Sequence, residues 1–99
     1  MSHPTTELDD VVHQRVRLGI LAVLAEASRA DFNFLRTTLS LTDGNLSRHL
    51  QVLEDAGCVE ISKVFEGKRP RTWVKATKRG RAAFARELEA LRALVDAHG

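Results

Sequence analysis

The sequence predicts a mainly α-helical domain with a small β-hairpin, an α+β class in which three helices come before the hairpin and one comes after it. Apolar residues recur at helical spacing over residues 8–57 and again over residues 78–97. Between these segments, β-branched and aromatic residues lie on both sides of the turn residues Gly67 and Pro70. The 99 residues are enough for one domain with one small core.

The composition excludes several classes of protein. Hydrophobic residues make up 43% of the chain and charged residues 28%, as in ordinary folded domains. No apolar run reaches the roughly 18 residues of a membrane span, and the N-terminus lacks the pattern of a signal peptide. We therefore expect no membrane partner and a cytoplasmic location. The single cysteine, Cys58, excludes an internal disulfide, and the histidines are scattered, so we expect no metal and no cofactor.

The first two helices are predicted from apolar spacing and capping residues. A flexible tail is expected over residues 1–7, and a single folded domain over residues 8–98. The first helix is predicted near residues 8–27, where no proline interrupts the apolar pattern. Asp31 is a suitable N-cap for a short second helix that carries Phe32 and Leu35.

The third helix has the clearest start and end signals. Thr42 is a favourable N-cap, and Gly57 supplies a left-handed C-cap. Between them, Leu46, Leu50 and Leu53 fall on one face and are expected to face the core. Beyond Gly57 the pattern changes to that of two strands, after which Thr77 can cap the last helix.

The outward face of the third helix is small and polar. Gly44, Asn45, Ser47, Arg48 and Gln51 lie opposite or beside the leucines. An arginine here could make a bidentate contact with guanine, and an asparagine or glutamine with adenine, in the major groove of DNA. The alternative is an ordinary solvated face.

Positive charge is concentrated around the hairpin. Residues 63–81 contain eight lysines and arginines against Glu66 alone, whereas residues 1–62 have a net charge of −4 and residues 82–99 of −1. This distribution favours a polyanionic partner. Lys63, Lys68, Arg69 and Arg71 surround the turn and could reach phosphates or a narrow minor groove, unless the hairpin is only a solvated loop.

The order helix, helix, turn, helix, strand, wing, strand, helix is that of a winged helix-turn-helix. The chain also resembles winged-helix transcriptional regulators of the MarR and ArsR kind, especially short single-domain members. The resemblance depends on HQRVRLGIL at residues 13–21, DFNFL at 31–35, LTDGNLSRHLQVLEDAG at 41–57, GKRPRT at 67–72 and TKRGR at 77–81.

The resemblance implies a homodimer that places two recognition helices in successive major grooves of an operator. It implies DNA contacts at Thr42, Gly44, Asn45, Ser47, Arg48 and His49, to which the helix face adds Gln51. It further implies that the first and last helices pair with the other subunit. The apolar spacing of the last helix over residues 78–97 also favours helix pairing, although the same stripe could pack on the first helix of its own chain. The expected dimerisation residues are Leu8, Val12, Phe84, Leu88, Leu91 and Val95.

We therefore expect a DNA-binding transcriptional regulator with no enzymatic activity, because no catalytic grouping and no phosphate-binding loop are present. The alternatives are a winged-helix protein-interaction module and an RNA-binding winged helix.

Three single residues have competing interpretations. Cys58 is interpreted as a buried thiol rather than a redox switch, and Trp73 as closing the sheet against a helix rather than stacking on a ligand. For His49, packing and phosphate contact both remain open. The sequence identifies no small-molecule effector.

Overall fold

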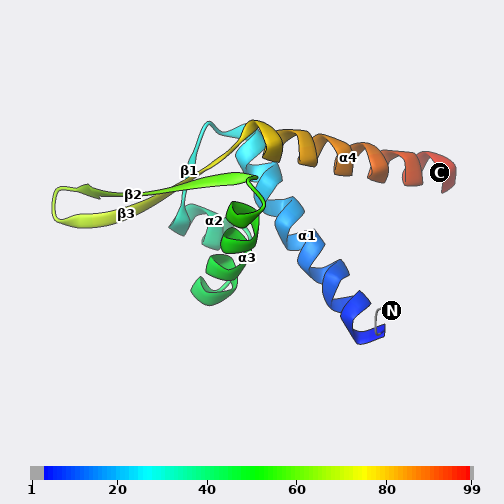
Figure 1. Cartoon of the computed structure of the whole chain (residues 1–99), viewed down its shortest axis with the longest axis horizontal. Helices are drawn as coiled ribbons and strands as arrows, with labels where there is room; N and C mark the ends of the chain where they lie inside the picture. The colour runs from blue at the N-terminus through cyan, green and yellow to red at the C-terminus, as the bar shows by residue number, and fades with distance from the viewer. Residues whose placement is uncertain (1–3, 99) are drawn as a thin grey trace.

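The computed structural model describes the backbone of residues 4–98 and the side chains of residues 15–97. It has the predicted order of three helices, a hairpin and a last helix, together with one additional short strand (Figure 1). The elements are α1 (Pro4–Glu26), β1 (Ala30–Asp31), α2 (Phe32–Thr38), α3 (Asp43–Asp55), β2 (Val59–Glu66), β3 (Arg69–Ala76) and α4 (Lys78–His98).

The strands form an antiparallel sheet in the order β1-β3-β2. The sequence did not predict β1, in which Ala30 pairs with Val74 and Asp31 pairs with Trp73. A strand of two residues is too short to show the alternation by which strands are recognised. It exists because the chain passes beside β3 in the folded molecule.

Helix α1 begins at Pro4 and so includes residues 4–7, which the sequence had placed in a flexible tail. Proline is well suited to the first turn of a helix, because its missing N–H would have no partner there. The remainder of the predicted tail, residues 1–3, lies outside the described residues.

The predicted caps are confirmed. Asp31 accepts a hydrogen bond from the backbone N–H of Phe34 at 2.6 Å, and Thr42 Oγ1 accepts one from the N–H of Asn45 at 3.1 Å. Gly57 has a φ of 76°, the left-handed geometry of a helix C-cap. Thr77 Oγ1 accepts a hydrogen bond from the N–H of Gly80 at 3.0 Å at the start of α4.

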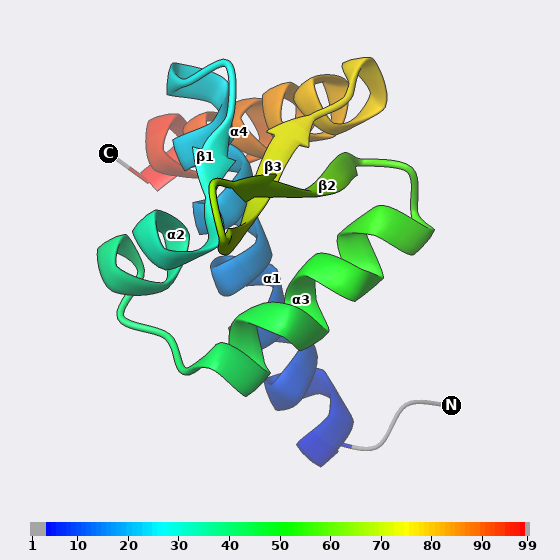
Figure 2. The same ribbon diagram turned by 90° about the vertical axis from the view of Figure 1, so that its left-hand side faces the viewer.

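The core lies where α1, α2 and α3 meet the base of the sheet (Figure 2). Ile20, Leu35, Leu46 and Val74 have the largest side chains that are fully buried, one from each of α1, α2, α3 and β3. The three leucines predicted to face inward from α3 are all buried, as is the thiol of Cys58. One core therefore fixes α3 relative to the hairpin.

The hairpin, which we call the wing (residues 59–76), ends in a two-residue turn of Gly67 and Lys68, because Glu66 pairs with Arg69. Gly67 has a φ of 65° and Lys68 has no positive φ, as in a type II′ turn with glycine first. The sequence predicted Pro70 as a turn residue, and this is wrong. Pro70 pairs with Phe65 inside the strands. At that non-hydrogen-bonded pair, the missing N–H of proline costs no bond to β2.

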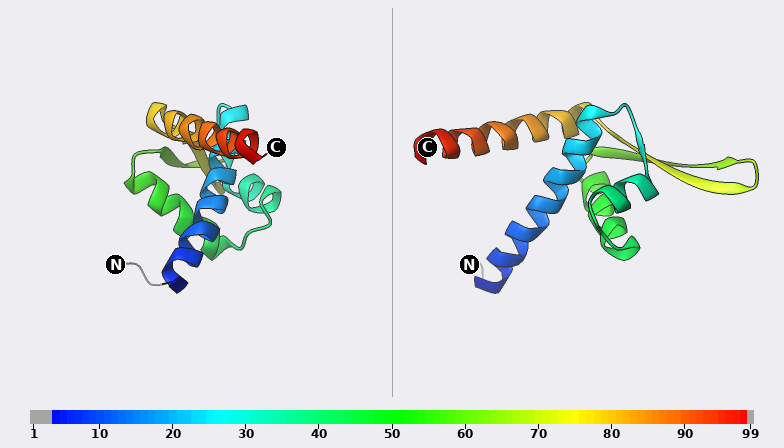
Figure 3. Two further views of the ribbon diagram at one scale, coloured as in Figure 1. Left: turned by 90° about the vertical axis from the view of Figure 1, so that its right-hand side faces the viewer. Right: turned by 180° about the vertical axis from the view of Figure 1, so that it is seen from behind.

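The molecule is elongated, with extents of 52 × 28 × 23 Å. The wing extends from one side of the helical body, and α4 extends from the other (Figures 1 and 3). Within the described residues, no helix is long and apolar enough to cross a membrane.

Candidate nucleic-acid interface

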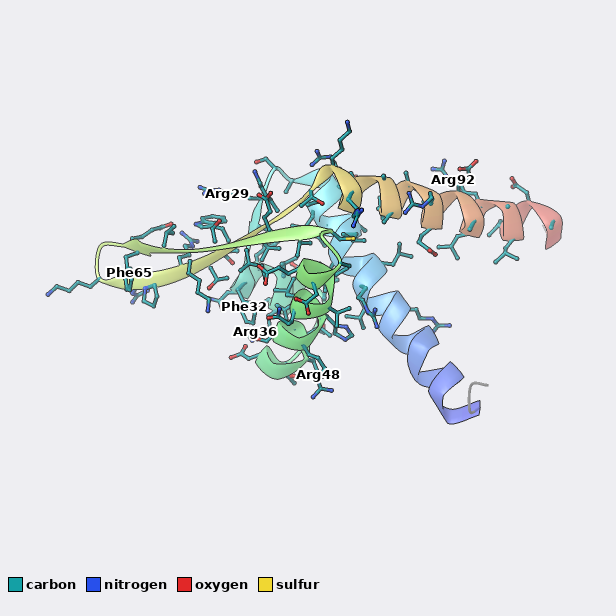
Figure 4. All side chains as sticks on the ribbon, in the orientation of Figure 1. Arg29, Phe32, Arg36, Arg48, Phe65 and Arg92 are labelled. Carbon is teal, nitrogen blue, oxygen red and sulfur yellow. The ribbon has the colours of Figure 1, made fainter. Side chains whose placement is uncertain are left out.

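Helix α3 presents the polar face that the sequence predicted. The side chains of Thr42, Asn45, Ser47, Arg48 and Gln51 are exposed, and so is Gly44. A Cβ atom added to Gly44 would have no atom within 4 Å, so the backbone there is open to a close approach. Arg48 points away from the sheet (Figure 4). This face therefore has the shape and chemistry needed to contact base edges.

Several polar groups on this face already have partners within the chain. Gln51 Nε2 donates to Asp55 Oδ1 at 2.9 Å, so one N–H of the Gln51 amide is already bound. Asp43 forms an ion pair with Arg36 at 3.0 Å, which offsets an acidic charge beside the start of α3. Arg36, which the sequence analysis did not single out, is a partner in that ion pair.

His49 differs from the other predicted contact residues of α3 because it is buried. Its side chain is 7% exposed and lies on the face that carries the buried leucines. This burial favours the packing interpretation of His49 over phosphate contact. His49 is therefore not among the residues of α3 that face solvent.

The wing has fewer available cations than the sequence count suggests. Lys63, Lys68 and Arg69 are exposed and form no ion pair within the described part of the chain. In contrast, Lys75 lies 3.5 Å from Glu60, and Arg71 is paired with Asp31 and Glu66. The cations of the wing that are free to meet a polyanion are therefore Lys63, Lys68 and Arg69.

Arg71, predicted as a DNA contact, is exposed but is bound by two carboxylates of its own chain. Its guanidinium donates to Asp31 Oδ2 at 2.8 Å and to Glu66 Oε2 at 2.9 Å. The guanidinium carbons of Arg71 and Arg29 lie 4.7 and 3.8 Å from the ring centroid of Trp73. Trp73 thus packs against two arginine side chains, an environment that the sequence did not predict.

Asp31 joins the wing to the helix-turn-helix. One carboxylate oxygen caps α2, and the other binds Arg71. The backbone N–H of Phe34, followed by the Arg71 guanidinium, lowers the pKa of Asp31 below its usual value. The sequence identified Asp31 as a cap only, because its second partner is 40 residues away.

A groove of about 400 Å³ connects α3 to the wing. Ser47 and Gln51 line it from α3, and Ile61, Lys63 and Thr72 line it from the wing. The exposed face of α3 and the nearer part of the wing therefore form one continuous surface.

The second exposed surface lies on α4. Its first turns belong to this chain's own core, because Ala83 and Phe84 pack against the buried cluster. Farther along, Leu91, Leu94 and Val95 are 43, 59 and 68% exposed, although Leu94 was not among the predicted dimerisation residues. Leu88 is half-buried, and the side chains of Leu8 and Val12 lie outside the described residues.

Neither surface has the features of a metal centre. Within the described residues, no three histidine, cysteine or acidic side chains are grouped so that they could hold a metal ion. The thiol of Cys58 is free and buried at the junction of α3 and β2.

A helix-turn-helix whose exposed recognition face adjoins a basic hairpin is the architecture of a winged helix DNA-binding domain. Residues 16–95 match the family described by that name. Over 69 residues, the chain is 46% identical to an uncharacterized protein of Methanocaldococcus jannaschii, covering 70% of this chain and 75% of the relative.

The chain is also similar to solved structures of transcriptional regulators. A transcriptional regulator homologue protein from Pyrococcus horikoshii OT3 is 36% identical, with a TM-score of 0.76 over 93% of this chain and 96% of that one. A MarR family transcriptional regulator from Silicibacter pomeroyi is 26% identical, with a TM-score of 0.67 over 84% of this chain and 55% of that one. The chain belongs to the winged helix DNA-binding domain family and is a DNA-binding transcriptional regulator.

Proposed function

We propose that the protein acts as a homodimer on operator DNA in the cytoplasm, without catalysing a reaction. In each subunit, α3 enters the major groove and the wing contacts the backbone or the minor groove. The observation that carries this proposal is the continuous surface formed by the exposed face of α3, the groove beside it and the free cations of the wing. Base-reading groups and phosphate-binding groups thus face one partner.

The proposed contacts differ in what they contribute. Asn45, Ser47 and Arg48 face outward and supply sequence readout. Lys63, Lys68 and Arg69 supply affinity that depends on salt. Arg71 stabilises the wing instead of contacting DNA, because its guanidinium is already bound to Asp31 and Glu66.

The exposed apolar half of α4 supports the homodimer. Leu91, Leu94 and Val95 give this half an apolar surface that is exposed to water in a single chain and would be covered in a dimer. A second copy of the chain offers the same surface, and a two-fold axis would pair the two copies. Such a dimer presents two copies of α3, and its operator would contain two half-sites.

Selection of bound duplexes from a random pool tests this proposal. We expect an enriched sequence with two related half-sites, whose centres are separated by about one helical turn of DNA or a multiple of it. Arg48→Ala should cost about 1 to 3 kcal/mol at one base position per half-site and relax the preference there. Arg86→Ala, which removes the same charge from α4, should leave the preference unchanged.

Two outcomes would replace this proposal with one of the alternatives. If structured RNA competes with the protein better than the selected duplex does, the winged helix is an RNA-binding domain. If micromolar protein forms no salt-sensitive complex with any duplex, the protein-interaction module is favoured.

A further inference from the structure

The end of the wing carries an exposed apolar side chain. Phe65 is 76% exposed, the highest value among the large hydrophobic side chains that the structure describes. Figure 4 shows it near the far end of the hairpin. A single exposed hydrophobic residue is common on protein surfaces, so its meaning depends on its position.

The strand register places Phe65 on the face of the wing that continues toward α3. Successive side chains of a strand alternate between the faces of the sheet, so Ile61, Lys63 and Phe65 share one face. Ile61 and Lys63 line the groove beside α3. Phe65 is the next residue on that face, and Pro70 lies directly opposite it on β3.

The charges around this apolar pair are positive. Lys68 occupies the turn and Arg69 adjoins Pro70, and neither forms an ion pair with a described residue. The nearest acidic residue, Glu66, is bound by Arg71 at 2.9 Å. An apolar pair between free cations suits DNA, whose phosphates are negative and whose stacked bases are apolar. It suits the apolar surface of a protein less well.

The pair is also held firmly. Proline has no side-chain rotamer freedom to lose, and the type II′ geometry at Gly67 suits the twist of the two strands. The backbone and Pro70 therefore need little further ordering when the pair meets a partner, and only the Phe65 side chain loses rotamer freedom.

We propose that Phe65 and Pro70 form an apolar wedge that enters the minor groove of DNA and partly unstacks one base step, while Lys68 and Arg69 bind the adjacent phosphates. Phenylalanine and proline are among the residues that act as such wedges in minor-groove binding proteins. The wedge favours the easily unstacked steps TA and CA/TG at the position of the wing. This inference deepens the proposed DNA-binding function and depends on it.

The test uses the duplex that the wild-type protein selects, with fluorescent dyes at its two ends and 2-aminopurine at single positions under the wing. The wild type should bring the ends closer and raise the 2-aminopurine fluorescence at one step. Phe65→Ala should remove both signals and weaken binding to a site with a TA step roughly tenfold. Its salt dependence should be unchanged, because no charge is lost.

Val64→Ala is the matched control. Val64 is the preceding residue, is 40% exposed and faces the other side of the wing, so its loss should leave both signals intact. Phe65→Thr keeps a β-branched residue in the strand and should behave like Phe65→Ala, which separates loss of the wedge from loss of the hairpin.

Several results would overturn the inference. If Phe65→Ala and Phe65→Thr bend and bind the duplex as the wild type does, the wedge is wrong while the DNA-binding function stands. If Phe65→Ala instead changes the sedimentation of the protein without DNA, Phe65 is a contact between protein chains. If the wild type selects no duplex, the proposed function fails together with the wedge.

Discussion

Asp31 shows how one carboxylate connects two parts of this protein. It caps α2, the first helix of the helix-turn-helix, and it also binds Arg71 of the wing. The start of α2 is therefore joined to the wing by an ion pair near the surface, whose side chains are 17 and 43% exposed. Pairs this exposed to solvent are weak when isolated, but here the guanidinium also binds Glu66 and stacks on Trp73.

Substitutions at Asp31 separate the cap from the ion pair. Asparagine caps a helix about as well as aspartate, so Asp31→Asn should remove the ion pair alone and slightly lower the midpoint of urea unfolding at pH 7. Asp31→Ala also removes the cap and should cost about 1 kcal/mol more. Equal midpoints for the two variants would show that the cap contributes nothing.

The effect of Asp31 on stability should depend on pH. Its pKa is lower in the folded state than in the unfolded state, so its contribution is present above the ordinary aspartate pKa of about 4. It is lost as the pH falls through the folded value. The stability difference between the wild type and Asp31→Asn should therefore shrink below about pH 4, as urea unfolding at pH 7 and pH 3 would show. A constant difference would contradict the assignment.

At the scale of single elements, the wing contributes affinity through the cations that remain free. Lys68→Ala and Arg69→Ala should each lower the slope of log K against log salt by roughly 0.9 per phosphate contact removed. A dimer would carry each substitution twice. Binding titrations against random duplex at several salt concentrations measure this slope.

Lys75→Ala is the control for the wing, because Lys75 lies on the same hairpin but already pairs with Glu60. Its slope should stay close to that of the wild type. If Lys75→Ala lowered the slope as much as Arg69→Ala does, the assignment of the phosphate contacts to Lys68 and Arg69 would be wrong.

The start of α4 requires a glycine at position 80, because a side chain there would have no room. A Cβ atom on Gly80 would overlap the backbone carbonyl of Cys58, which accepts a hydrogen bond from the N–H of Thr77 at 3.0 Å. Gly80→Ala should therefore lower the free energy of unfolding by about 1 to 3 kcal/mol, although alanine is the better helix former. Gly44→Ala is the matched control, because its Cβ meets no atom within 4 Å. It should leave stability unchanged or slightly raised, and thermal unfolding of both variants checks this.

At the scale of the whole molecule, the two exposed surfaces lie at opposite ends. The wing extends from one side of the body and the apolar half of α4 from the other, so a partner can cover α4 without covering α3 (Figure 3). This separation allows dimerisation and DNA binding to occur together. It also allows each to be disrupted alone.

Val95→Lys places a charge in the apolar half of α4 and should yield a monomer of 11.0 kDa by analytical ultracentrifugation. Operator affinity should fall with it, since a monomer binds only one half-site. Ala93→Lys adds the same charge about 160° around the helix and should leave the dimer intact. The dimerisation surface is elsewhere if Val95→Lys remains dimeric.

The sequence by itself determined the elements that depend on neighbouring residues. The leucine spacing of α3, the caps at Asp31, Thr42 and Thr77, and the C-cap at Gly57 are all local signals. The polar outward face of α3 followed from the same periodicity, because the buried leucines leave only the other face exposed. These predictions are confirmed.

Only the tertiary structure decided the features that join residues distant along the chain. These features are the pairing of β1 with β3, the ion pair of Arg71 with Asp31, the arginines over the ring of Trp73, and the burial of His49. The tertiary structure also divided α4 into a half that packs on its own core and a half that stays exposed. Charge counting along the sequence cannot show which cations are already paired, because pairing depends on what the fold brings within a few ångströms.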